Sequence, residues 1–250
     1  MKKLIAMLVT VTIVGSLGLA QEEPIPPKRD KMPKVGLFGG YTPGWLFVDV
    51  GPVNEFLLGG KGAPLSDNGV WMNGGAGAVY IMVVKNLRIG GMGAGGGIQS
   101  TALEPSGLRR DAELNIGYGG VTLEYVLPFG QRFDIAAGAM IGSGSTTLTL
   151  RRSLKETNSW SGEQLLLLNG TDSSTINVTR RLQGSFVTII PSLNFEYAVL
   201  NWLGVRLGAS YVWMFSPSWT VDDKYDLVGV PSGIKGSGFM IHAGLLVGTF

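Results

Sequence analysis

The chain of 250 residues contains no cysteine and only one histidine, His242. Without cysteine, the protein has neither disulfides nor the lipid-modified cysteine that anchors a lipoprotein. One histidine without cysteine does not make a metal centre. No metal and no cofactor are therefore expected.

Charged residues are also few, at 15%, whereas hydrophobic residues make up 45% and the mean hydropathy is +0.25. After residue 20, however, no apolar run approaches the roughly 18 residues that a membrane-spanning helix needs. An apolar chain without such a helix suits either a buried β core or a β-barrel whose outer face contacts lipid.

The first 20 residues have the layout of a secretory signal peptide. Lys2 and Lys3 precede an apolar stretch at 4–17, and a small-residue cleavage site follows. An uncleaved anchor helix is the alternative, but the apolar stretch is short and contains hydroxyl residues. Residues 21–34 are rich in proline and charge and predict a flexible periplasmic leader before a domain at 35–250. Removal of the signal cancels the net charge of +2, so nucleic acid is not an expected partner.

Apolar residues occupy every second position in much of this domain, most clearly at 203–215. A period of two predicts a β-strand. An apolar face opposite a small or polar face is typical of a strand in a transmembrane barrel. The apolar face here consists of Leu203, Val205, Leu207, Ala209, Tyr211, Trp213 and Phe215.

The same pattern predicts eight strands, at 35–41, 71–84, 87–100, 111–127, 132–150, 181–199, 203–215 and 237–250. Short turns at 84–87, 128–131 and 200–202 alternate with long polar gaps at 42–70, 101–110, 151–180 and 216–236. An even number of strands puts both termini on the side of the short turns, which in outer-membrane barrels is the periplasm. We therefore expect an all-β fold, an eight-stranded antiparallel up-and-down transmembrane β-barrel, in a bacterial outer membrane with N- and C-termini periplasmic.

Aromatic residues gather at both ends of the predicted strands, as in the two interfacial belts of a membrane barrel. A secreted lipid-binding barrel with an apolar interior is the alternative. The group near the short turns is Tyr125, Phe129, Phe133, Tyr197, Trp202 and Phe250. The group near the long gaps is Trp45, Phe47, Trp71, Phe186, Trp213, Phe215, Trp219 and Phe239.

In topology, aromatic belts and the terminal Phe250, residues 35–250 resemble the small bacterial outer-membrane barrels of the OmpA, OmpX and OmpW type. The resemblance implies that the barrel-assembly machinery reads the aromatic end of the last strand. The chain departs from the family's pattern, because the apolar face of this strand runs in the other phase. Either Phe250 follows a bulge or the recognition differs. The positions counted back by twos from Phe250 are Gly248, Leu246, Gly244 and His242.

Five charged residues are predicted to face the lumen near the short turns: Arg88, Glu124, Asp134, Glu196 and Arg206. A basic residue that faced lipid at the bilayer midplane would cost about 2–4 kcal/mol. We therefore expect these charged side chains to face the lumen and pair with one another. Turn positions put Glu196 opposite Arg206 and Glu124 opposite Asp134, with Arg88 near the two acids. We predict a polar plug in the lower lumen; a gated narrow pore is the alternative.

Glycines concentrate at 74–77 and 90–97. Glycine in a strand marks a bend or a close approach, so we expect barrel curvature, with Met92, Met140 or Met214 filling the lumen. A ligand-shaped cavity is the alternative.

His242, Ser210 and Glu196 supply the residue types of a Ser–His–acid site, which would suit a lipid-modifying enzyme. The simpler interpretation is a lumen histidine bonded to its neighbours. No catalytic residue is assigned, and we expect no enzyme.

Two long gaps are candidate partner sites, 42–70 and 151–180. Residues 51–60 could form one or two helical turns on the rim, and 151–180 could bind a surface partner or lipopolysaccharide phosphates. The sequence thus predicts a structural or surface-interaction role, surrounded by outer-membrane lipid. A narrow channel, a hydrophobic-ligand-binding or transport barrel, and a lipid-modifying enzyme are the alternatives.

Overall fold

The computed structural model describes residues 36–249 except 82, 155–177 and 232. The predicted signal peptide (1–20), the leader (21–34) and Phe250 lie outside the described residues. Most of the predicted 151–180 gap lies outside them too.

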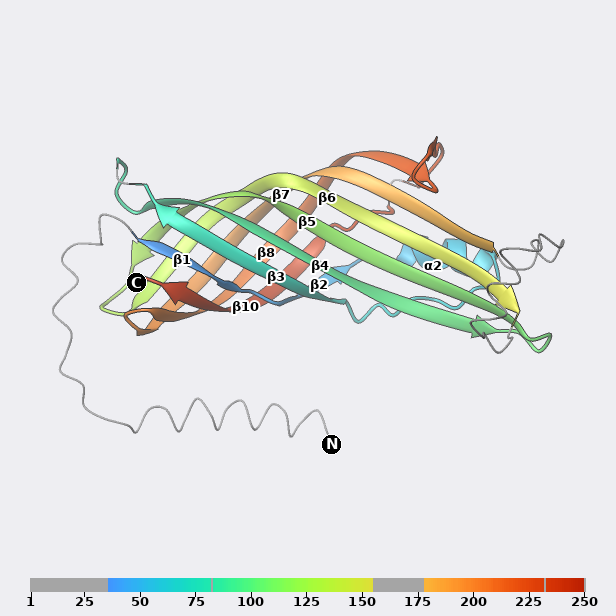
Figure 1. Cartoon of the computed structure of the whole chain (residues 1–250), viewed down its shortest axis with the longest axis horizontal. Coiled ribbons are helices and arrows are strands. Elements are labelled where there is room, and N and C mark those ends of the chain that lie inside the picture. The colour runs from blue at the N-terminus through green and yellow to red at the C-terminus, as the bar shows by residue number, and fades with distance from the viewer. Residues whose placement is uncertain (1–35, 82, 155–177, 232, 250) are drawn as a thin grey trace, which may run out of the picture. The chain divides into compact units, whose positions relative to one another are not determined.

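Antiparallel strands make up most of the described chain (Figure 1). One helix, α2 (Gly51–Gly59), interrupts them near the start. The strands are β1 (Leu37–Tyr41), β2 (Gly44–Val48), β3 (Val70–Tyr80), β4 (Leu87–Leu103), β5 (Leu108–Pro128), β6 (Phe133–Leu154), β7 (Val178–Leu200), β8 (Leu203–Val221), β9 (Tyr225–Asp226) and β10 (Gly238–Gly248).

The sheet closes on itself through β10, which pairs with β8 on one side and with both β1 and β2 on the other. Strands β1 and β2 also share β3 as their other neighbour, so together they occupy one position in the ring. They are separated at Thr42-Pro43, where proline has no N–H to give to a neighbour. With the two-residue β9 outside the ring, the described part of the chain forms a barrel with eight strand positions and no open edge.

Alternate residues of each strand face outward and inward. On β8, Leu207 and Trp213 are 57% and 46% exposed, whereas Val212 and Met214 are buried. An apolar outer face around a filled interior is the arrangement of a membrane barrel, not of a soluble one with an apolar cavity. The predicted eight-stranded antiparallel up-and-down transmembrane β-barrel is therefore confirmed. Among the described residues, no helix is both long and apolar enough to cross a membrane.

Outward aromatic pairs lie at both ends of the barrel. Trp45 meets Trp71 edge-on at the end with the longest strand tips, and Phe129 meets Phe133 edge-on at the short-turn end. Two residues assigned to the outer belt were placed wrongly, because Phe186 and Trp219 are buried inside the lumen, where their rings pack edge-to-face 5.7 Å apart.

Several strand limits differ from the sequence prediction. The gap predicted at 101–110 is mostly strand, and only Glu104–Gly107 turn the chain, with Gly107 at φ +84°. Likewise, β2 and α2 lie in the gap predicted at 42–70. The reason is that strand ends beyond the bilayer lose the alternating apolar signal while keeping their backbone pairing.

The predicted opposition of Glu124 and Asp134 requires a turn centred on Phe129, but the turn after Pro128 is centred on Gln131. Phe129 N–H donates to Phe133 O at 2.7 Å, and Gly130 takes φ +87°. This hairpin aligns Asp134 with Pro128 and Glu124 with Gly138, so the predicted opposition of Glu124 and Asp134 was wrong.

Glycines on the inner face allow the β3–β4 wall to curve. A Cβ added to Gly90 would lie 2.1 Å from the carbonyl oxygen of Gly77, and one added to Gly96 would lie 2.0 Å from that of Trp71. The β3 backbone could not approach β4 so closely if either glycine were replaced by a residue with a side chain.

Candidate functional site

The lumen near the short turns holds an ionic layer, which consists of Arg88, Glu124, Glu196 and Arg206. Strand alternation turns all four inward, and pairing places Arg88 beside Glu124 and Glu196 beside Arg206. All four side chains are buried. In this layer, the predicted opposition of Glu196 and Arg206 is what the register gives.

Arg88 joins strands on different sides of the lumen. Its Nε donates to Glu124 Oε2 at 2.7 Å, while Nη1 and Nη2 donate to the two oxygens of Glu196 at 2.8 and 2.5 Å. The contact with Glu196 is a bidentate guanidinium–carboxylate pair, which fixes both side chains. The ion pairs therefore bridge the interior instead of following one hairpin.

Arg206 completes the charge balance of the layer. Its Nη2 lies 2.6 Å from Glu196 Oε1 and 3.6 Å from Glu124 Oε2. Both guanidinium groups also lie over the ring of Phe38, at 4.7 Å for Arg88 and 5.2 Å for Arg206. Two cations thus face two anions, with an aromatic ring of β1 as a further cation–π partner.

Asp134, the fifth charged residue predicted here, is buried on the same inner side. It is aligned with Glu196 on the neighbouring strand. The structure therefore places all five predicted charges in one region of the lumen. Of the two predicted oppositions, Glu196 with Arg206 is present and Glu124 with Asp134 is not.

His242 and Ser210 lie above the ionic layer. Asn194 Nδ2 donates to Glu124 Oε1 at 3.1 Å, and His242 Nε2 lies 2.8 Å from Asn194 Oδ1. Within the described residues, the buried Ser210 hydroxyl has no hydrogen-bond partner. Because Glu196 is held by two arginines and His242 by an amide, the three residue types of a Ser–His–acid site are not arranged as one.

Farther from the short turns, the lumen is filled by an apolar plug. It is formed by inward side chains of the strands together with α2 and the segment before β10. The plug includes Val53, Leu57, Leu114, Met140, Leu148, Phe186, Ile190, Met214, Trp219, Ile234 and Met240. Met92 packs against it, so the three methionines named as lumen fillers all contribute.

The sequence does not predict that α2 enters the mouth of the barrel. The sequence suggested a helix on the rim, whereas Val53 and Leu57 are buried in the plug. Their i, i+4 spacing after Val50 is the signal that could have indicated a buried helix face. With both layers in place, the cavities left beside Asn194 and Thr122 are only about 10 Å³ each.

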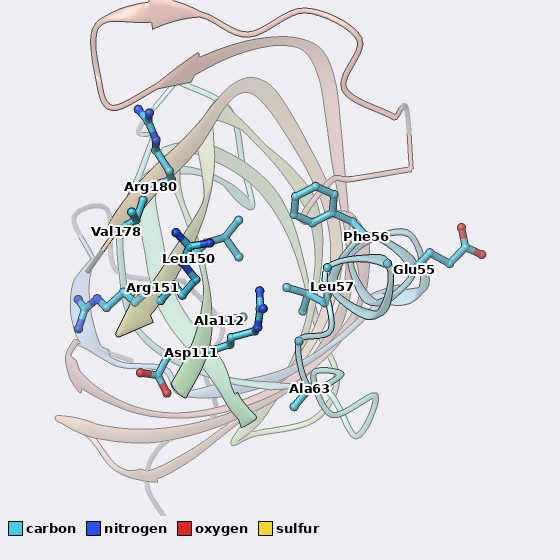
Figure 2. Close-up of a pocket in the computed structure, with 15 residues that line it drawn as sticks. Glu55, Phe56, Leu57, Ala63, Asp111, Ala112, Leu150, Arg151, Val178 and Arg180 are labelled. Carbon is cyan, nitrogen blue, oxygen red and sulfur yellow. The ribbon is translucent and has the colours of Figure 1, made fainter. Parts of the chain in front are cut away.

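A larger cavity of about 600 Å³ opens at the mouth, between α2 and the outer ends of β5, β6 and β7. In this mouth cavity, Phe56 and Leu57 reach from α2 toward Leu150 on the opposite wall (Figure 2). Its apolar lining is Phe56, Leu57, Ala63, Ala112, Leu150 and Val178. Four arginines and two acids also line it, namely Arg110, Arg151, Arg152, Arg180, Glu55 and Asp111.

Within the described residues, no three histidine or acidic side chains are grouped so that they could hold a metal ion.

No protein-family model matches the chain, and no curated protein matches it in sequence. Among solved structures, it is similar to Neisserial surface protein A (10% identity, TM-score 0.40, 87% of this chain and 98% of that one). It is also similar to a major outer membrane protein of Thermus thermophilus (9%, TM-score 0.40, 86% and 98%) and to Ail, the attachment invasion locus protein of Yersinia pestis (10%, TM-score 0.35, 85% and 97%). Likenesses at these TM-scores carry no information about function, which therefore has to follow from the chain's own geometry.

Proposed function

We propose that the protein is a closed outer-membrane barrel with a structural or surface-interaction role. The observation that carries this proposal is the double closure of the lumen, by the ionic layer near the short turns and by the apolar plug above it. A barrel filled in this way offers no path for solutes, and its useful surface is the rim.

The proposed orientation places the short turns and both termini in the periplasm. Strands β5, β6 and β7 have 21, 22 and 23 residues, about twice the 9–11 that cross a bilayer. Their excess length extends the end opposite the termini, as expected of extracellular tips. We further propose that this rim, including 42–70 and 151–180, contacts lipopolysaccharide or a surface partner. Assembly through the C-terminal strand, with Phe250 as its signal, completes the proposal.

Planar-bilayer recording tests the closure. The purified protein is expected to give no stable conductance, and Arg206→Ala should stay silent because the apolar plug remains above the ionic layer. A narrow channel would instead show steps in the wild type that change in Arg206→Ala. Such steps would refute the closed-lumen proposal.

Deletion of 158–174 tests the role of the rim. The shortened protein is expected to keep its heat-modifiable gel mobility and to lose adhesion to a lipopolysaccharide-coated surface or to host cells. Unchanged adhesion would remove this loop from the proposal.

An enzyme would be recognised by a change in membrane lipid on expression that disappears in His242→Ala; we expect the same lipid profile in both.

A further inference from the structure

We propose that the mouth cavity binds a single-chain amphiphile with an anionic head group, a carboxylate or a phosphate. This site goes beyond the structural role proposed above, because a closed barrel does not need it.

The inner walls of the cavity suit an alkyl chain. Phe56 is 52% exposed and lines the cavity, whereas Val53 and Leu57 of the same helix are buried in the plug. It faces Leu150 across the cavity (Figure 2). A volume of about 600 Å³ lies within the roughly 300–1,000 Å³ of small-molecule sites, which are mostly apolar with a few polar groups.

The outer wall carries closely spaced arginines. Arg110 on β5 and Arg152 on β6 are directly opposite in register and share the inward face of Ala112 and Leu150. Each guanidinium group carries five N–H donors, more than one carboxylate partner uses, and its planar shape matches carboxylate and phosphate oxygens.

The arginines are also held in place. Glu104 Oε1 lies 3.0 Å from Arg110 Nη2, and Asp222 pairs with Arg180, which is aligned with Leu150 on β7. The two acids of the lining do not oppose an anion, since Asp111 and Glu55 point away from the cavity (Figure 2). The cavity therefore combines an apolar interior with a fixed cationic edge.

The floor of the cavity determines what the site does. Leu57 and Ala112 belong to both the lining and the plug, so the cavity ends blindly above the closed lumen. The geometry therefore favours retention of the ligand at the mouth, not passage through the barrel.

The test uses the full mature protein in nanodiscs of neutral phosphatidylcholine, with dansyl-undecanoic acid as the fluorescent probe. Saturable binding is expected, with displacement by laurate or dodecyl phosphate at least about tenfold better than by dodecyltrimethylammonium. Whichever anion displaces better identifies the head group, and either result supports the site. No saturable binding, or equal displacement by the cation, would overturn the proposal.

Matched variants locate the site. Phe56→Ser should weaken every probe, whereas Leu58→Ser, on the same helix and 58% exposed, should not. Arg152→Gln and Arg110→Gln should each weaken the anionic probes about tenfold, while Arg109→Gln, on the adjacent outward position, should leave binding unchanged. Heat-modifiable mobility confirms that each variant is folded. Equal losses in the variants and their controls would contradict the assignment.

Discussion

Arg88 is the side chain on which the ionic layer depends, because it is almost completely buried and holds Glu124 and Glu196 from different strands. Removal of one member of such a buried network leaves uncompensated charge behind, which costs far more than loss of an exposed pair. The stability of the barrel is therefore most sensitive to the loss of a single side chain from the ionic layer.

Arg88→Met is expected to lower the free energy of unfolding by about 3–5 kcal/mol, because two carboxylates would then share Arg206 alone. Urea unfolding in lipid vesicles, followed by tryptophan fluorescence, measures the loss. Arg109→Met, at an exposed position, is the control and should change little. Adding Glu196→Gln to Arg88→Met should recover part of the loss; a still larger loss would show that the charge balance is not the cause.

Asp222, which follows β8 beyond the membrane-spanning part, gives a pH-dependent prediction. The backbone N–H of Arg181 donates to its carboxylate at 3.0 Å, and the Arg180 side chain pairs with it, so its pKa is lowered. A lowered folded-state pKa means that the contribution to stability is complete above the ordinary carboxyl pKa and is lost as pH falls through the lowered value.

Asp222→Asn should therefore be less stable than the wild type at neutral pH, with the difference vanishing in acid. Urea midpoints at neutral and acid pH give the comparison. A difference that does not depend on pH would mean that the carboxylate charge is not what holds the β7 end to the turn after β8.

At the scale of elements, β4 is thinned by glycine on its inner face, where it approaches β3. The sequence could indicate this curvature, because glycine in a strand marks bends and close approaches. Which glycines are needed follows only from the register, since that decides whether an added Cβ meets a backbone atom.

Gly90→Ala and Gly95→Ala separate these roles on one strand. The new Cβ at 90 would lie 2.1 Å from Gly77 O, whereas at 95 the nearest atom would be 3.7 Å away. Gly90→Ala is expected to cost about 1–3 kcal/mol of unfolding free energy, and Gly95→Ala about 0.5 kcal/mol or less. Equal urea midpoints for the two variants would show that the wall is not tight at position 90.

The sequence predicts local features of the fold but not the contacts between distant segments. The alternation of apolar and polar residues predicts the strands and shows that Glu196 and Arg206 face the lumen, because a period of two is a local property of the sequence. The bidentate contact of Arg88 with Glu196 joins residues 108 positions apart, and no local pattern contains it. The buried face of α2 and the mouth cavity likewise arise from packing between distant segments, so the sequence could offer them only as a rim helix and an unspecified cavity.

At the scale of the whole molecule, the barrel depends on β10, the last strand, which pairs with β1 and β2 on one side and with β8 on the other. Closure gives every strand position of the ring a neighbour on both sides and turns the apolar faces outward together, which a membrane-spanning sheet requires. The closed lumen, the cationic mouth and the outward apolar belt all presuppose that this joint forms in the register described.

Disulfide trapping at the β1–β10 joint tests this account most directly, since the chain has no cysteine of its own. Gly39 and Val247 are aligned across the joint, and antiparallel partners have Cα separations of about 4.5–5.5 Å, which a disulfide can span. Gly39→Cys with Val247→Cys is predicted to oxidise almost completely in the membrane and to run as a compact cross-linked form on denaturing gels. Gly39→Cys with Ile241→Cys, displaced by six residues along β10, should stay reduced. Failure of the first pair to cross-link, or equal cross-linking of both pairs, would contradict the closed barrel.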